Sequence, residues 1–496
     1  MTETSRSLDP QDWTSLRANG HRMLDDMLDY IEQIRERPVW QNIPDDVRAK
    51  FQQKLPQQPE DLAQVHQRFM QDVLPYAVGN SHPGFMGWVQ GGGTPVGMLA
   101  EMLAAGLNAN LGGRDQMPIE VENQVTQWMR ELFHFPASAT GLFVTGTSIA
   151  NFIAVLVART KTLGIASRRQ GLAASSHKLV AYTSIGAHAC VSQAIDMAGI
   201  GIDSLRLISV NANFEMDIQE LERKIDADRA AGYTPFLIAG TAGTVDVGAI
   251  DDLDALAEVA QKHQLWFHID GAYGALAMLS DTIAPRLKGI ERADSIAFDF
   301  HKWAQVQYDA GYILVRDGQA HFDTFATPTS YLKRETRGIA TGERWPCDFG
   351  PDLSRGFRAL KAWFTIQVYG VEQLGNMIAH TCELAQYLKQ SIARESQLEL
   401  LAPVNLNIVC FRYRPTSDAT ITLTLDELNR DIVFALHESG IAAPSTTRVN
   451  GDLAIRAALV NHRTNQQDID RMIAATLRFG DQLVDSHSLL QAAKDY

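Results

Sequence analysis

Three short apolar runs between Leu265 and Asp317 constrain the fold of this chain more than any other feature. The runs are Leu265–Ile269, Ser295–Phe300 and Gly311–Val315, and each is bounded by glycine or charged residues. Runs of this length are typical of strands buried on both faces of a sheet, because core helices need ten or more residues. The sequence therefore predicts an α/β fold with these strands in its central sheet.

Two charged residues stand at the carboxyl ends of the first two runs. Asp270 ends the first run, and Lys302 follows the second after His301. Ligands of parallel sheets bind outside the carboxyl ends of the strands. A lysine and an aspartate at this rim are what pyridoxal 5'-phosphate (PLP) requires, because the amine bonds to the cofactor aldehyde and the carboxylate pairs with the ring nitrogen. The plainer alternative is a solvated lysine and an Asp-Gly turn.

Strands and helices alternate from Gly141 onward, which is the pattern of a mostly parallel sheet covered by helices on both faces. Further strands are predicted at Gly141–Val144, Leu179–Thr183, Ser204–Val210 and Phe236–Ala239. Helices are predicted at Ile149–Thr160, Asp217–Ala231 and Leu253–His263. We expect this large domain to occupy residues 81–375, between an N-terminal helical segment (1–80) and a small α+β domain (376–496).

The N-terminal segment predicts an amphipathic helix that begins near Asp9 and Pro10. Its apolar residues recur at spacings of three and four and form one stripe: Leu24, Met27, Leu28, Ile31 and Ile34. Such a stripe must be buried, either against the body of the same chain or against a second subunit.

The composition excludes several classes of function. A net charge of −14 over 496 residues argues against a nucleic-acid or anionic-membrane partner. No apolar run reaches the length of a membrane span, and the N-terminus lacks the basic and apolar regions of a signal peptide. The four cysteines have no metal-like spacing, so we expect reduced thiols, no metal site and a cytoplasmic location.

The turn from Thr145 to Ser148 (TGTS) joins a predicted strand to a predicted helix. Free amides at a helix N-terminus, together with two hydroxyl groups, suit an anion such as a phosphate, although such residues also serve simply as helix caps. His188 follows the next strand, where an imidazole can stack on a flat ring, move a proton or be an ordinary loop residue. With Lys302 and Asp270 at neighbouring strand ends, phosphate binding becomes the better interpretation.

A series of motifs extends over residues 10 to 475. In order, they are SHPGFMG, PIEVENQVTQW, GLFVTGTSIAN, GAHACVSQAIDMAGIG, AGTAGTVDVGAIDDL, HIDGAYG, ADSIAFDFHKW with YDAGYILVRD, FRALKAWFTIQVYG and LAIRAALVNHRT. The series resembles that of PLP-dependent group II amino-acid decarboxylases, of the aromatic-L-amino-acid decarboxylase branch. HIDGAYG and HKW at their separation are its specific elements. The resemblance implies PLP fold type I, the aspartate-aminotransferase type, and a homodimer with the site at the interface and the N-terminal helix swapped.

The resemblance also implies roles for individual residues. The expected catalytic residues are Lys302, which holds the cofactor, Asp270, which pairs with its ring nitrogen, and His188, which stacks on its ring. The other expected cofactor contacts are Gly146, Thr147, Ser148, Ser295 and His301 around the phosphate, and Thr244 and Ala272 along the ring. The expected substrate contacts are His82, Pro83, Phe85, Trp88, Arg114 and Trp345.

Two stretches depart from the pattern of the family. The family assigns protonation of Cα to a tyrosine on a mobile loop, which is replaced by phenylalanine in related aldehyde synthases. Here the loop Arg334–Pro351 contains no tyrosine, and Trp345 lies near the expected place. In the stretch NANLGGRDQMP, glycines replace bulky residues and Arg114 stands where an aromatic residue is expected. Arg114 could bind a substrate carboxylate or form an ordinary salt bridge.

These observations support four hypotheses. The leading one is decarboxylation of an L-amino acid, with an aromatic one expected, to the amine and carbon dioxide. The second is oxidative decarboxylation to an aldehyde, which the missing tyrosine favours. The third is decarboxylation of an acidic or small amino acid, which Arg114 favours. The fourth is a catalytically silent scaffold, against which the joint presence of Lys302, Asp270 and His188 argues.

Overall fold

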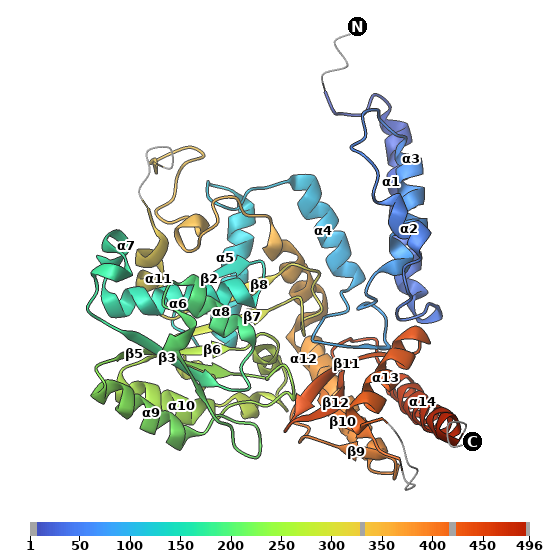
Figure 1. The fold of residues 1–496 in the computed structure, drawn as a ribbon. Helices are drawn as coiled ribbons and strands as arrows, with labels where there is room; N and C mark the ends of the chain where they lie inside the picture. Colours follow the sequence, from blue (N-terminus) through green and yellow to red (C-terminus); the bar gives the residue numbers. More distant parts are fainter. Residues whose placement is uncertain (1–6, 328–332, 416–422, 493–496) are drawn as a thin grey trace.

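The computed structural model describes residues 7–327, 333–415 and 423–492. An N-terminal helical arm, a large α/β part and a smaller C-terminal part follow one another along the chain (Figure 1). Within the described residues, the helices include none that combines the length and the apolar character needed to cross a membrane.

The large part is built on a seven-stranded sheet with the order β2-β8-β7-β6-β5-β3-β4. Its strands are β2 (Thr140–Val144), β3 (Leu179–Ser184), β4 (Leu205–Ile208), β5 (Thr234–Thr241), β6 (Trp266–Asp270), β7 (Ser295–Asp299) and β8 (Gly311–Val315). All seven predicted strands are therefore confirmed. The neighbours from β4 to β7 pair in parallel, whereas β8 is antiparallel to both β7 and β2. The sheet is mixed at this edge because the short connection from β7 to β8 has no room for a crossover helix.

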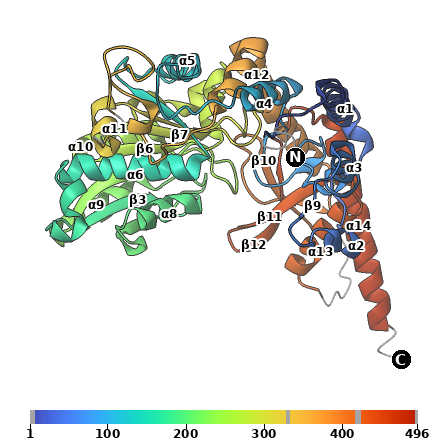
Figure 2. The same ribbon diagram turned by 90° about the horizontal axis from the view of Figure 1, so that it is seen from above.

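Helices cover both faces of the large sheet, as its mostly buried strands require (Figure 2). Side chains alternate along each strand, so Leu179 and Ala181 enter one core cluster while Val180 and Tyr182 enter the other. The first cluster includes residues of α6 (Thr147–Leu163), α8 (Ala189–Met197) and α11 (Gly318–Phe325). The second includes residues of α5 (Met117–Leu132), α9 (Ile218–Ala230), α10 (Leu253–His263) and α12 (Arg358–Ile392).

The N-terminal arm consists of α1 (Trp13–Glu32), α2 (Asp45–Lys50) and α3 (Leu62–Asp72), and α4 (Pro95–Leu107) connects it to the large part. The predicted start of the first helix was wrong, because Asp12 caps α1 by accepting the backbone N–H groups of Thr14 and Ser15. Neither α1 nor α3 contains a buried residue. Both helices stand beside the rest of the chain (Figure 1), and several of their apolar side chains, among them Met23, Leu28 and Phe69, are exposed in a single subunit.

The C-terminal part is a five-stranded sheet with the order β1-β11-β12-β10-β9. Its elements are β1 (Phe85–Met86), β9 (Leu398–Leu400), β10 (Ile408–Tyr413), β11 (Ala443–Val449), β12 (Asp452–Ala458), α13 (Leu425–Glu438) and α14 (Gln466–Ala492). Strand β1 was expected in the large domain, but it pairs in parallel with β11 and so belongs to the small sheet. The expected boundary after residue 375 falls inside α12, whose backbone leaves helical geometry at Gly370 (φ 70°, ψ 165°).

Candidate active site

A pocket of about 410 Å³ opens at the carboxyl ends of the parallel strands, within the size range of small-molecule sites. Its walls are formed by Trp88, Val89, Gln90, Thr145, Gly146, Thr147, Ser148, His188, Cys190, Thr241, Gly243, Val245, Asp270, Ala272, Tyr273, Asp299, His301, Lys302 and Tyr308. Lys302 and Asp270, which come from two adjacent strands, thus face the same cavity.

The end of the pocket beneath α6 is suited to an anion. Gly146 is the N-cap of α6 and Thr147 is its first residue, so amides at this helix start lack partners within the helix. The Thr147 N–H donates to Asp299 Oδ1 at 2.8 Å, while the buried Thr147 hydroxyl has no protein partner. A Cβ at Gly311 would lie 2.3 Å from Gly146 Cα, so the start of β8 presses directly against this turn. A phosphate would satisfy the unpaired hydroxyl and the helix dipole.

Lys302 is held by Asp299 at the same end of the pocket. The ammonium lies 3.0 Å from Asp299 Oδ2, and His301 Nε2 lies 3.6 Å from that oxygen. Burial lowers the pKa of His301, so this imidazole is neutral under ordinary conditions. Tyr308 packs against His301 with a centroid separation of 4.3 Å and a tilt of 33° between the rings; it is half exposed and lines the pocket. Burial, and secondarily Asp299, raise the pKa of Tyr308 to about 12.

Asp270 lies at the other end of the pocket and accepts hydrogen bonds only. Its Oδ2 receives Asn151 Nδ2 at 3.1 Å and the Cys190 thiol at 3.6 Å, and its Oδ1 receives the Ala272 N–H at 3.1 Å. Burial and the neighbouring Asp270 raise the pKa of Cys190, which therefore remains a thiol donor. An acceptor-only carboxylate is matched to a ligand that presents an N–H.

His188 caps α8 by accepting the Cys190 N–H at Nδ1, at 3.2 Å, and its exposed ring lines the pocket. Thr244 lies just outside the lining, in the turn after β5, where its hydroxyl accepts the Ala249 N–H. Ser295 was expected near the phosphate, and this expectation was wrong. It begins β7, the opposite end of the strand from Asp299, and bonds to His268 and Trp266 instead.

Of the expected substrate residues, only Trp88 lines this pocket. His82, Pro83 and Phe85 are buried where the arm meets the small sheet; Phe85 packs on Val39 and Ala443. Their position follows from the pairing of β1 with β11, which the sequence did not reveal.

Trp345 and Arg114 form a separate cluster outside the pocket. The buried Trp345 ring lies 4.7 Å from the Arg114 guanidinium and 3.6 Å from that of Arg334. A Cβ on Gly113 would come within 2.3 Å of the Trp345 indole, so this ring fills the space that a side chain at Gly113 would take. Arg114 is therefore engaged with Trp345 rather than directed at the pocket of its own chain.

Several site residues were missed from the sequence. Asn151 occurs one helical turn after Thr147, and His268 occurs two residues before Asp270, hence on the same side of β6. These spacings were the available signals. Asp299 and Tyr308 lie close to Lys302 in the sequence, three residues before it and six residues after it. Arg456 is buried between the two sheets, and its guanidinium donates to the carbonyls of two residues that line the pocket, Trp88 and Val245.

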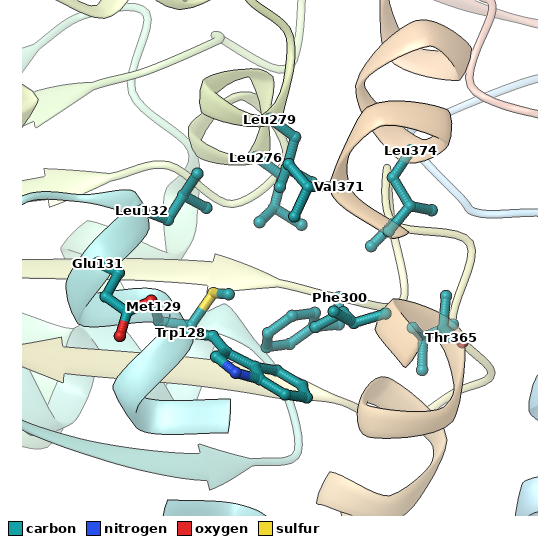
Figure 3. A pocket seen from close by; sticks show the side chains of 13 residues that line it. Trp128, Met129, Glu131, Leu132, Leu276, Leu279, Phe300, Thr365, Val371 and Leu374 are labelled. Atoms are coloured by element: carbon teal, nitrogen blue, oxygen red, sulfur yellow. The ribbon is translucent and has the colours of Figure 1, made fainter. Parts of the chain in front are cut away.

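A second cavity, of about 230 Å³, lies between α5 and α12 behind Phe300 (Figure 3). Its walls are almost wholly apolar, and they include neither a lysine nor a histidine. Glu131 is the one titratable residue among the described residues that line it, with no second such group beside it, so the pocket around Lys302 is the candidate active site.

Comparison with known proteins decides the family. Residues 44–414 match the pyridoxal-dependent decarboxylase conserved domain. The chain belongs to this family. This decarboxylase is 32% identical to an aromatic-L-amino-acid decarboxylase of Bacillus atrophaeus, over 92% of this chain and 93% of that one. It is 27% identical to a phenylacetaldehyde synthase of Arabidopsis thaliana, over 94% and 96%.

The fold of this decarboxylase agrees with the assignment. Its structure superposes on that of Catharanthus roseus tryptophan decarboxylase in complex with L-tryptophan with a TM-score of 0.85, at 26% identity, covering 96% of this chain and 100% of that one. The fold is PLP fold type I, and the protein is a PLP-dependent amino-acid decarboxylase. The pocket fits this cofactor, because it offers an unpaired hydroxyl and a helix start at one end, an acceptor-only carboxylate at the other, and a lysine.

Proposed function

We propose that this decarboxylase converts an L-amino acid with an aromatic side chain to the corresponding amine and carbon dioxide. The pocket that contains Lys302, Asp270 and His188 carries the proposal, because a catalytically silent scaffold would not need these three residues in one cavity. Two observations support the aromatic substrate: the half-exposed rings of Trp88 and Tyr308 in the pocket wall, and the similarity to an aromatic-L-amino-acid decarboxylase.

Each end of the cofactor is assigned to particular residues. Thr147 and Ser148 hold the phosphate at the start of α6, Asp270 pairs with the ring nitrogen, His188 covers the ring, and Lys302 bonds to the aldehyde. The bound cofactor supplies a protonated ring that accepts the electron pair released as the carbon–carboxylate bond breaks. Asp270 holds that proton on the ring, since the protein groups bonded to it are all donors.

The protonation of Cα requires a donor, and we assign it to Tyr308. The loop Arg334–Pro351 has no tyrosine. Tyr308 lines the pocket, and with a pKa raised to about 12 it keeps its proton at neutral pH. General acids of this kind contribute about 10²- to 10⁴-fold to a rate. His188 is the alternative donor in the same pocket.

The direct test is turnover of Tyr, Trp, Asp and Glu, with carbon dioxide, amine and hydrogen peroxide all measured. We expect amine and carbon dioxide in equal amounts from an aromatic substrate without oxygen consumption. Peroxide and ammonia together with an aldehyde would favour the second candidate, which the similarity to a phenylacetaldehyde synthase supports. Turnover of Asp or Glu alone would contradict the aromatic assignment, and the contact of Arg114 with Trp345 already argues against a role for Arg114 in binding an acidic side chain.

We further propose a cytoplasmic homodimer. All four cysteines are free and buried, which suits a reducing compartment. The arm leaves large apolar side chains exposed, among them Met23 and Leu28 on α1 and Val65 and Phe69 on α3. A second copy is their expected cover, because monomers rarely expose such faces. Sedimentation should show a dimer that Phe69→Asp dissociates, whereas Gln64→Asp on the same helix should not; a monomeric parent protein would contradict the proposal.

A further inference from the structure

A chain of buried side chains reaches Asp270 from behind the active site. Trp266 Nε1 bonds to Ser295 Oγ at 2.8 Å, and Ser295 Oγ bonds to His268 Nδ1 at 2.9 Å. His268 Nε2 bonds to Asn151 Oδ1 at 2.8 Å, and Asn151 Nδ2 bonds to Asp270 Oδ2 at 3.1 Å. We call these four residues behind Asp270 the relay.

The relay is shielded from water. Asn151, His268 and Ser295 are each at most 1% exposed, and none of the four residues lines the pocket. Buried polar groups of this kind are found where their hydrogen bonds are made, since an unpaired one destabilises the folded state. Contact with a ligand does not explain the presence of an imidazole, an amide and a hydroxyl here.

The donor and acceptor at every link are fixed by chemistry. The Asp270 carboxylate can only accept, so Asn151 turns its N–H₂ toward Asp270 and its Oδ1 toward His268. Burial lowers the pKa of His268 to about 4, so the ring is neutral, and because Asn151 Oδ1 needs a donor the single N–H lies on Nε2. His268 Nδ1 therefore accepts from the Ser295 hydroxyl, which in turn accepts the indole N–H of Trp266.

The last donor of the relay, the Asn151 amide, bonds to the Asp270 carboxylate. If the Asn151 amide turned over, its oxygen would face the Asp270 carboxylate and its N–H₂ would face the His268 N–H, so both contacts would become repulsive. The relay therefore presents a donor to Asp270 in one orientation only. Three titratable groups also face or neighbour this carboxylate: the Cys190 thiol at 3.6 Å, the neutral His268 on the same strand, and Lys302 in the same pocket.

We propose that Trp266, Ser295, His268 and Asn151 are positioning residues that keep Asp270 a charged acceptor aimed at the ring nitrogen of the cofactor. This inference rests on the proposed pairing of Asp270 with that nitrogen. The relay should therefore strengthen the binding of PLP to the protein through one atom of the ligand, its ring nitrogen. A purely structural role would affect the binding of any ligand of the same shape.

The test compares PLP with 1-deaza-PLP, in which a C–H replaces the ring nitrogen. The protein is stripped of PLP with hydroxylamine and titrated with each compound by visible absorption and tryptophan fluorescence. His268→Leu removes the donor to Asn151 and should weaken PLP binding about tenfold, while leaving 1-deaza-PLP binding within twofold. His268→Gln, whose amide can still donate to Asn151, should recover most of the lost affinity. Ser295→Ala, which is three links from Asp270, should show a smaller loss of the same kind.

The chain offers a matched control in His321. This histidine is also fully buried, bonds through Nδ1 to a hydroxyl (Thr140, 2.8 Å) and has a pKa lowered to about 4 by burial, but this bond leads to β2 and not to Asp270. His321→Leu should lower the stability of the cofactor-free protein as His268→Leu does, and leave PLP affinity unchanged. Equal losses for both ligands, or unchanged PLP affinity in His268→Leu, would overturn the proposal. Since turnover is not measured, a protein that binds PLP but makes no amine would refute only the proposed reaction.

Discussion

Arg456 offers a sharp test of how the two sheets build one active site. The residue lies on β12 and is 3% exposed. Its guanidinium donates to the carbonyls of Val245 (2.8 Å), Asp246 (3.1 Å) and Trp88 (3.1 Å), and to the hydroxyl of Ser445 (3.0 Å). Trp88 and Val245 both line the pocket, so a single side chain from the small sheet fixes two parts of its wall.

Arg456→Met should lower the free energy of unfolding by about 3–5 kcal/mol, because several buried acceptors lose their hydrogen-bond donor together. The methionine leaves three carbonyl oxygens and one hydroxyl without their donor, at about 1–3 kcal/mol for each one that stays dry, and the relief of burying a guanidinium offsets part of this cost. Arg456→Lys should recover little, because one ammonium cannot reproduce a planar fork that spans three segments.

The assays are chemical denaturation and steady-state kinetics at saturating PLP. Because the pocket wall is displaced while Lys302 and Asp270 are untouched, we expect KM to rise more than kcat falls. Arg412→Met is the matched control, since Arg412 lies on the adjacent strand β10 and pairs with Glu399 and Asp452, away from the pocket. Equal effects of the two substitutions on KM, or an Arg456→Met protein as stable as the parent, would refute the reasoning.

Three further predictions concern the site and the fold. Lys302→Ala should abolish turnover and leave the oligomeric state unchanged in sedimentation, because the side chain pairs with Asp299 and supports no other element. Residual turnover above 1% of the parent rate, on the order of what a non-covalent route would leave, would contradict the covalent role of Lys302. Tyr308→Phe should reduce amine formation about 10²-fold or more, with the lost product appearing as aldehyde and peroxide; unchanged amine output would return the donor role to His188. Stability should fall as pH drops from about 6.5 to 4. Burial lowers the pKa values of His268, His321 and His462 to about 4, so in this range the unfolded chain takes up protons before the folded chain does. Each histidine contributes about 3 kcal/mol of stability above this window, and denaturation of His321→Phe should show a shallower pH dependence than that of the parent.

The sequence predicted the parts of the molecule that follow from local pattern. The strands that carry Asp270 and Lys302 are short apolar runs ended by charge, and buried parallel strands have no other common sequence form. The turn at Gly146 was recognisable because hydroxyl groups and a glycine precede an apolar helix. These features require no knowledge of distant contacts.

The expectations that failed depend on contacts between distant segments. His82 and Phe85 were expected at the pocket, but β1 is placed by its pairing with β11, over 350 residues later in the chain. Ser295 carries the correct type of side chain for a phosphate contact, yet it stands at the wrong end of its strand. Arg114 was expected to bind a substrate carboxylate or to form a salt bridge, whereas the missing side chain of Gly113 makes room for the Trp345 ring on which Arg114 lies.

One helix connects the two ends of the candidate site. Thr147, the first residue of α6, offers its unpaired hydroxyl to the phosphate end, and Asn151 on the same helix bonds to Asp270 at the nitrogen end. Four residues of helix advance about 6 Å and return to the same face, so both groups point toward the sheet from one rigid element. Gly146 and the close approach of Gly311 fix the position of the start of this helix. They therefore also fix the position of Asn151 relative to His268. Gly311→Ala should accordingly weaken PLP binding even though Gly311 itself does not line the pocket, and 1-deaza-PLP should be weakened as strongly, because a displaced α6 disturbs the phosphate site as well as the relay.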